Sequence, residues 1–582
     1  MNNKYYTDER NVQVVLALLK EFGIRKVIAS PGTTNITLIA SMQQDSFFEI
    51  YSAAEERSAA YMACGLAAES NEPVVLSCTG ATASRNYLPG LTEAFYRKLP
   101  IVAITSTQNT SNIGHLVPQV IDRGSHPNDV VLLSETIHPV KDDNDLWTAT
   151  IQVNRALLAL THRGGGPVHL NLVTSYSHNF SVKELPSIRK ISRICLTDAF
   201  PELPKGKIAV YVGAHAIWTS QQEEALDRFC AENNAVVFCD HTSNYKGHYR
   251  VLYPLVQTQE AFISETNTVD LLIHIGEVSG TYAYPSCKEV WRVSEDGELR
   301  DFFKRLHYIF EMPEQLFFAH YTIGSNPQQG HDSYLQACRE TYESVYKSIP
   351  EDIPFSNIWI AQKMAPKLPE NSILHLGILN SLRSWNFFEI PHTVYSSSNV
   401  GGFGIDGCMS TLIGASLAHK DKLHFGVFGD LAFFYDMNSI GNRHIGNNIR
   451  ILLINNGKGT EFRQYNHMAA AFGDDADLYM AAAGHYGNKS PLLIKHYAED
   501  LGFTYICAPD KETFDKVYMQ FLTPEMNSKP ILFEVFTNNV DESNALKMIR
   551  TCVSSAEGKL RKVASQIVPS AAKNLIKGFI KK

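Results

Sequence analysis

The chain has 582 residues and a formal net charge of −8, with 52 Lys and Arg against 60 Asp and Glu. Hydrophobic residues make up 44% of it and charged residues 19%, an ordinary globular composition that excludes a disordered or collagen-like chain. The length predicts about three or four domains, and the mild acidity excludes a global nucleic-acid-binding signature.

The cysteines and the apolar runs exclude further classes. Ten cysteines are scattered between Cys64 and Cys552 without a C-x-x-C pair, so neither a zinc site nor a redox dithiol is indicated. The polar N-terminus does not have the pattern of a secretory signal, and no apolar run is long enough to predict a membrane span. We therefore expect reduced thiols in a cytoplasmic protein.

In the first part of the chain, short apolar runs alternate with amphipathic stretches. The expected strands are 26–30, 73–78, 100–106 and 167–173, and the expected helices include 11–22 and 55–69. Such alternation predicts an α/β fold, a parallel sheet covered by helices. We place a first domain at 1–185.

The pattern restarts after a polar stretch with several prolines. Expected strands at 207–213, 235–240 and 269–276, with a helix at 219–233, predict a middle domain over 207–345. The turn after its first strand has one glycine where a dinucleotide fingerprint needs several, so we expect neither NAD nor FAD.

A third α/β block runs over 354–545. Its expected strands are 372–377, 423–430, 449–456 and 530–536. The complete prediction is three doubly wound parallel-sheet domains.

The tail, 546–582, differs in charge from the rest. From Lys559 to Lys582 it has seven Lys or Arg and no acid, with apolar residues at helical spacing, and Pro569 would kink the helix. A basic amphipathic helix can lie on an anionic membrane, pack on its own oligomer, or bind another protein.

The strongest local signal lies in the third block. One apolar strand ends at Asp430, and the next ends at Asn456, followed by Gly457-Lys458-Gly459. Both ends fall on the carboxyl edge of a parallel sheet, where open α/β sheets bind ligands. The Asp430 carboxylate, the Asn456 amide oxygen and the Lys458 carbonyl are hard donors that suit Mg²⁺. A helix cap and a plain turn explain either piece alone, whereas the pair favours a metal site.

This pair resembles the diphosphate motif of thiamine-diphosphate enzymes, with Leu431 where the family usually has Gly. Two further segments, 404–411 (GIDGCMST) and 379–382 (LNSL), resemble the menaquinone-pathway branch of that family, the succinyl-enolpyruvyl-hydroxycyclohexene-carboxylate synthases (MenD). The resemblance implies thiamine diphosphate and Mg²⁺ as cofactors. The residues that it places against the cofactor in this domain are Asn380, Ser381, Ile405, Asp430, Leu431, Ala432 and Asn456.

The N-terminal domain carries a matching feature. The family has a glutamate on a helix with glycine nine residues later, which Glu56 and Gly65 satisfy, whereas Glu55 would put that glycine at ten. The resemblance implies that Glu56 exchanges a proton with the cofactor pyrimidine, work that suits a desolvated carboxylate. By the same resemblance, Pro31 and Asn86 belong to cofactor-binding loops.

Four arginines of the menaquinone branch are replaced here. The residues at those positions are Thr34, Gln108, Trp385 and Val400. Arginine forks bind carboxylates through paired hydrogen bonds, so their loss predicts a different acceptor substrate.

Two more residues are candidates for substrate contact. The segment 113–119 (IGHLVPQ) resembles a loop of acetolactate-synthase-like enzymes, in which His115 would move protons and Gln119 would hydrogen-bond an intermediate. A surface loop is the alternative. His485, in a glycine-rich stretch, is a weaker candidate from a lid.

The resemblance implies an enzyme that decarboxylates a 2-oxo acid and then protonates the product or transfers it to an acceptor. Its active sites would lie between subunits of a homodimer or homotetramer. An authentic menaquinone-pathway synthase using 2-oxoglutarate and isochorismate is the first alternative, and a non-catalytic scaffold on the same fold is the second.

Overall fold

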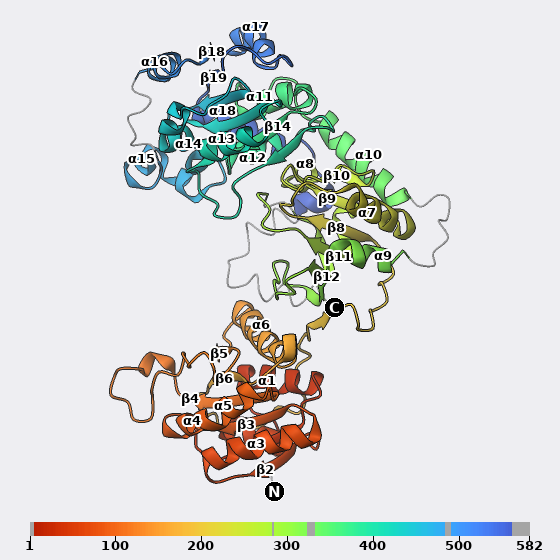
Figure 1. Cartoon of the computed structure of the whole chain (residues 1–582), viewed down its shortest axis with the longest axis vertical. Coiled ribbons are helices and arrows are strands. Elements are labelled where there is room, and N and C mark those ends of the chain that lie inside the picture. Colours follow the sequence, from red (N-terminus) through yellow and green to blue (C-terminus); the bar gives the residue numbers. More distant parts are fainter. Residues whose placement is uncertain (1–4, 282–283, 323–331, 483–489, 561–582) are drawn as a thin grey trace. The chain divides into compact units, whose positions relative to one another are not determined.

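The computed structural model describes residues 5–281, 284–322, 332–482 and 490–560. Their contacts form two compact units (Figure 1). The first unit contains Met1–Ala199 and Gly297–Glu311, and the second contains Phe200–Asp296 and Met312–Lys582. The domain boundaries set out above remain predictions.

A six-stranded parallel sheet forms the centre of the first unit, with strand order β2-β1-β3-β4-β6-β5. The strands are β1 (Lys26–Ala29), β2 (Glu49–Ser52), β3 (Val74–Cys78), β4 (Ile101–Thr107), β5 (Ser134–Ile137) and β6 (Val168–Val173). The helices are α1 (Arg10–Glu21), α2 (Ile36–Gln43), α3 (Glu56–Ser70), α4 (Thr82–Asn86), α5 (Leu88–Tyr96) and α6 (Asp143–Ala159). The strands and helices predicted for this part of the sequence are confirmed.

Helices cover both faces of this sheet because its strands are apolar on both sides. Val75 packs in the core with α1 and α6, whereas its neighbour Leu76 packs with α3 and α5. Successive strand residues point to opposite faces, so continuous apolar runs require two covered faces. On the second face, α5 approaches α3 closely at Gly90, where a Cβ atom would lie 2.4 Å from the Cβ of Ala60.

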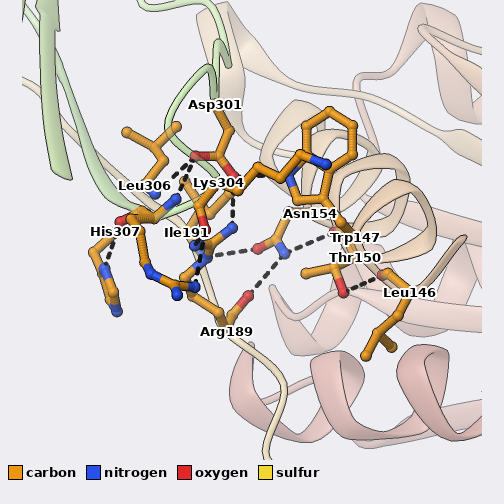
Figure 2. Close-up of polar contacts among 11 residues, drawn as sticks. Leu146, Trp147, Thr150, Asn154, Arg189, Ile191, Asp301, Lys304, Leu306 and His307 are labelled. Atoms are coloured by element: carbon orange, nitrogen blue, oxygen red, sulfur yellow. Dashed lines mark hydrogen bonds and ion pairs between the residues drawn. The ribbon is translucent and has the colours of Figure 1, made fainter. Parts of the chain in front are cut away.

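An ion pair with a buried carboxylate joins the two chain segments of the first unit (Figure 2). Asp301 lies just before β13 (Leu306–Glu311), which pairs with β7 (Ser192–Ile194). Its carboxylate accepts hydrogen bonds from Arg189 Nη2 at 2.5 Å, Trp147 Nε1 at 3.0 Å and the Leu306 N–H at 2.9 Å. Burial lowers the pKa of Arg189, and the Asp301 charge opposes that shift.

Asp301→Ala is expected to destabilise the protein by about 3 kcal/mol, because it leaves the largely buried Arg189 guanidinium without its counter-ion. Thermal unfolding should show a melting temperature lower by about 2–4 °C for each kcal/mol. Lys304→Gln is the control, since it keeps the Asp301–Arg189 pair. It removes the exposed contact of Lys304 Nζ with Asn144 Oδ1 and the cation–π contact with the Trp147 ring, each worth less than about 1 kcal/mol. Equal effects of the two substitutions would contradict this role of the pair.

The second unit contains two parallel sheets. In one, the strand order is β10-β9-β8-β11-β12. Its strands are β8 (Ile208–Val212), β9 (Val236–Cys239), β10 (Arg250–Leu252), β11 (Thr268–Ile275) and β12 (Ser286–Ser294). The helices of this part are α7 (Ser220–Asn233), α8 (Pro254–Gln257), α9 (Glu314–His320) and α10 (Ser333–Lys347).

The other sheet has the order β15-β14-β16-β17-β19-β18. Its strands are β14 (Ile373–Leu376), β15 (Tyr395–Ser397), β16 (His424–Gly429), β17 (Ile449–Asn455), β18 (Thr504–Ala508) and β19 (Ile531–Phe536). The helices are α11 (Asn357–Met364), α12 (Asn380–Trp385), α13 (Cys408–Ala418), α14 (Asp430–Asp436), α15 (Ala476–Tyr479), α16 (Leu493–Asp500), α17 (Lys511–Phe521) and α18 (Asn539–Arg550). Separate apolar cores on its two faces complete the predicted α/β architecture.

Several sequence predictions concern the ends and loops. Most of the predicted basic tail helix, 561–582, and the candidate His485 lie outside the described residues. All ten cysteines lie inside them, and all are free thiols, as expected. No helix among the described residues has the length and apolarity needed to cross a bilayer.

Candidate active site

The two predicted diphosphate loops meet at one edge of the sheet. Strands β16 and β17 pair in parallel with Gly429 opposite Ile454, so Asp430 and Asn455 follow at the same level. Asp430 begins α14 and is 2% exposed. Its carboxylate accepts hydrogen bonds from the backbone N–H of Leu431, at 2.9 Å, and from that of Gly457. The loop after β16 therefore touches the loop after β17.

Burial dominates the electrostatics of Asp430. It raises the pKa of this carboxyl group from the usual 3.8 to about 7, although the bonds from Leu431 and Gly457 lower it. The charge of Glu534 adds to the rise, and burial also raises the pKa of Glu542 to about 7. Glu534 and Glu542 each interact electrostatically with Asp430, so a cation beside Asp430 would offset this repulsion.

The remaining predicted metal donors fit such a cation. The half-buried Asn456 side chain accepts only a long hydrogen bond, 3.4 Å, from the Lys458 N–H. The Lys458 ammonium is bound to Asp477 at 2.7 Å, so its charge is already compensated there. A carboxylate, an amide oxygen and a backbone carbonyl make a hard oxygen set that suits Mg²⁺.

A buried glutamate holds the end of β17. Glu534, in β19, accepts from Asn455 Nδ2 and from the Tyr505 hydroxyl, each at 2.7 Å. These bonds fix the residue directly before Asn456. Sequence reasoning missed Glu534, although an acid inside the apolar run 530–536 was a visible signal.

Helix α12 brings Asn380 to the same loops. With its amide oriented to satisfy both partners, Asn380 donates to Glu461 Oε2 at 2.9 Å and accepts from the Glu461 N–H at 3.1 Å. Arg383 binds the other oxygen of Glu461 at 2.6 Å. Ser381 is buried, and Asn357 Nδ2 donates to its hydroxyl at 3.5 Å. Glu461, which sequence reasoning also missed, thus connects α12 to the loop that follows β17.

The other predicted contacts of this unit surround α14. Ile405 is half-buried and packs on the core that contains Ala432. Leu431 approaches Gly459, where a Cβ atom would lie 3.1 Å from Leu431 Cδ1. Leu431, which stands where the family usually has glycine, thus packs on the loop that follows β17.

In the first unit, the two candidate glutamates have different roles. Glu55 caps α3, because its carboxylate accepts from the N–H of Arg57 at 3.2 Å and of Ser58 at 2.7 Å. Glu56 is the first helical residue and half-buried. Burial raises the pKa of the nearby Tyr87, and the charge of Glu56 adds to the rise. Because the Glu55 carboxylate is occupied as the helix cap, Glu56 is the better candidate of the two for contact with a cofactor.

The predicted cofactor loops of this unit lie at the carboxyl ends of the strands. Gly32 follows the exposed Pro31 and packs on Thr79, where a Cβ atom would lie 2.6 Å from the Thr79 Cβ. Ala81 precedes α4 with a φ of 56°, a conformation that is strained for a residue with a Cβ atom. Asn86 is exposed at the end of α4.

His115 and Gln119 are both exposed, on the loop after β4. The structure brings the Gln119 backbone to the cofactor loops. A Cβ atom at Gly80 would lie 3.4 Å from the Gln119 carbonyl oxygen. The roles of both residues stay predictions.

Three of the four residues at the arginine positions of the resembled branch face inward. Trp385 and Val400 are buried in one apolar core, and Trp385 Nε1 donates to Asn357 Oδ1 at 3.2 Å. Thr34 is buried too, and its hydroxyl donates to the Ser106 carbonyl at 2.9 Å. Gln108 is half-buried and hydrogen-bonds Tyr176.

Comparison with known proteins gives the following similarities. Residues 10–126 match the family model described as thiamine pyrophosphate enzyme, N-terminal TPP binding domain. The 2-succinyl-5-enolpyruvyl-6-hydroxy-3-cyclohexene-1-carboxylate synthase of Phocaeicola vulgatus is 28% identical over 567 residues, covering 93% of this chain and 98% of that protein. The synthase of Bacteroides fragilis is 29% identical over 571 residues, with the same coverage.

A more distant synthase, from Porphyromonas gingivalis, is 25% identical over 581 residues, covering 94% of this chain and 98% of that protein. Among solved structures, the thiamine diphosphate-dependent 4-hydroxybenzoylformate decarboxylase of Rhodococcus jostii matches with a TM-score of 0.39 and 16% identity. That match covers 91% of this chain and 99% of the decarboxylase.

Proposed function

Because this chain is a thiamine-diphosphate-dependent enzyme of the MenD synthase type, we propose that it decarboxylates a 2-oxo acid and transfers the product carbanion to an acceptor other than isochorismate. The observation that carries the difference in acceptor is the inward packing of the residues at the replaced arginine positions. Trp385 and Val400 lie in the core, so the forks that bind polycarboxylate acceptors are missing from both positions.

Residues of the second unit hold the diphosphate. Asp430, Asn456 and the Lys458 carbonyl would hold Mg²⁺, which would supply positive charge to offset the buried carboxylate and the diphosphate. Backbone N–H groups at the N-terminus of α14 would be available to hydrogen-bond the diphosphate. Asn380, Ser381 and Ile405 complete the cofactor contacts on this side.

Residues of the first unit would transfer protons and contact the substrate. Glu56 would share a proton with the aminopyrimidine ring, and His115 and Gln119 would contact the substrate from the loop after β4. When bound, thiamine diphosphate supplies the electron sink for the carbanion left by loss of CO₂. In the family, these two sets of residues come from different subunits, so we propose a homodimer or homotetramer in the cytoplasm.

The proposed reaction is tested by a panel of 2-oxo acids, with CO₂ release measured with and without aldehyde, enoate and isochorismate acceptors. We expect release that requires thiamine diphosphate and Mg²⁺, and a carbon–carbon product with an acceptor other than isochorismate. Efficient use of 2-oxoglutarate with isochorismate would instead establish the authentic synthase. No CO₂ release from any donor, together with no thermal stabilisation by the cofactors, would favour a scaffold.

A further inference from the structure

An arginine is buried at the cofactor edge of the first unit without a counter-ion. Arg123 is 2% exposed. Its Nη2 donates to Asn171 Oδ1 at 2.5 Å and to the Thr105 carbonyl at 3.5 Å. Its Nη1 is buried and has no hydrogen-bond partner, and no ion pair to Arg123 occurs within the described part of the chain. A buried guanidinium in this state is costly, so an anion that reaches it would be held strongly.

The groups around Arg123 cannot supply the missing negative charge. Burial raises the pKa of the Cys78 thiol to about 12, so this neighbour is neutral near pH 7. Burial lowers the pKa of His126 and of His169, so neither imidazole competes as a cation. The pKa of Arg123, lowered by burial to about 10, still leaves it charged, and Arg85 adds a second positive charge.

A second buried arginine shows what a purely structural role looks like. Arg450, in β17, is 0% exposed, but both of its terminal nitrogens have backbone partners. Nη1 donates to the Asn447 carbonyl at 3.2 Å and Nη2 to the Glu525 carbonyl at 3.1 Å. In Arg123, by contrast, both bonds are made by Nη2, which leaves Nη1 able to bind a ligand.

The unpartnered nitrogen lies at the cofactor loops. A Cβ atom at Gly80 would lie 3.6 Å from Arg123 Nη1 and 3.4 Å from the Ser106 and Gln119 carbonyl oxygens. Two further buried polar atoms of this edge lack a partner, Ser106 Oγ and His126 Nδ1. The covering segment contains Leu116, which is 99% exposed, and has left-handed backbone at Leu116 and Gln119. A shift of this loop would open Nη1 to the site.

We propose that Arg123 binds a carboxylate of the substrate remote from the reacting carbonyl, replacing the anion-binding arginines that this chain lacks. The inference rests on the proposed function for the identity of the substrate, but not for the binding of an anion. The ligand class is an organic dicarboxylate, with one carboxylate on Nη1 and the loop after β4 closing over it.

The test uses the full chain without cofactor and succinate as the probe. We expect succinate to raise the melting temperature of the wild-type protein, and Arg123→Met to lower the succinate affinity at least tenfold, whereas Arg123→Lys retains part of it. Without succinate, Arg123→Met should be at least as stable as wild type, because a buried unpaired charge is removed. Arg450→Met should lose stability and keep the wild-type affinity.

Steady-state kinetics of the active enzyme provide an independent test. Arg123→Met should raise KM at least tenfold for a dicarboxylic 2-oxo acid, with kcat and the KM for pyruvate little changed. Absence of a succinate shift in wild type, or an unchanged succinate affinity in Arg123→Met, would overturn the inference. If no 2-oxo acid releases CO₂ but succinate binding still depends on Arg123, the proposed function fails and the anion site stands.

Discussion

Glu56→Gln is expected to lower kcat by about 10³-fold, within the range typical of a lost general acid–base group. Glutamine keeps the size of the side chain and removes the exchangeable carboxyl proton. The affinity for thiamine diphosphate should change far less, because the proposed ligands of the diphosphate and its metal are residues of the second unit. Single-turnover CO₂ release, together with a cofactor titration by thermal shift, separates the two effects.

The adjacent glutamate is a matched control. Glu55→Gln weakens the cap of α3, which accepts the N–H groups of Arg57 and Ser58. Loss of such a cap costs roughly 1 kcal/mol of stability, with turnover near the wild-type value. A loss of turnover in Glu55→Gln but not in Glu56→Gln would reverse the assignment of the two residues.

Asp430→Asn is expected to lower the affinity for thiamine diphosphate with Mg²⁺ by about 100-fold or more, equivalent to roughly 2.7 kcal/mol. The substitution removes the one charged ligand in the proposed metal set and leaves the side-chain shape almost unchanged. Thermal shift or calorimetry over a range of cofactor concentrations gives the affinity. Asp352→Asn is the control, because that carboxylate is exposed and pairs with Lys511.

In the protein without cofactor, Asp430→Asn should increase the stability against unfolding above pH 7. The pKa of Asp430 is raised to about 7, so above that pH the ionised carboxylate is buried at a cost. Stability should therefore fall as pH rises from about 4 to 7 in wild type, and this part of the fall should be absent in Asp430→Asn. At pH 8 the variant should melt higher than wild type. A lower melting temperature at pH 8 would show that the Asp430 bonds outweigh its desolvation.

The fold was largely predictable because its strands are short apolar runs between amphipathic helices. Such a pattern appears in the sequence without knowledge of tertiary contacts, as the runs at 73–78 and 449–456 show. The meeting of Asp430 with the loop after Asn456 was also predictable, because parallel strands that are neighbours end at one edge. Glu534 could also have been found from the sequence, because an acid inside an apolar strand is a visible signal.

Other parts of the site were not predictable because they depend on contacts between distant segments. Nothing near Glu461 indicates that it accepts from Asn380 and Arg383 on another helix. Arg123 lies in a polar loop sequence that suggests an exposed side chain, yet it is buried beneath that loop. The choice between Glu55 and Glu56 rested on one residue of spacing, and the cap at Glu55 adds a physical reason for it.

The bonds of Glu461 have a consequence for the kinetics of cofactor uptake. Since Asn380, Arg383 and Glu461 already join α12 to the loop that follows β17, little chain entropy remains to be lost when the diphosphate arrives. The rate of thiamine diphosphate binding should then depend on diffusional encounter and on the metal concentration, and not on slow ordering of a loop. Glu461→Gln would weaken the ion pair with Arg383 and introduce a slow, concentration-independent phase into reconstitution.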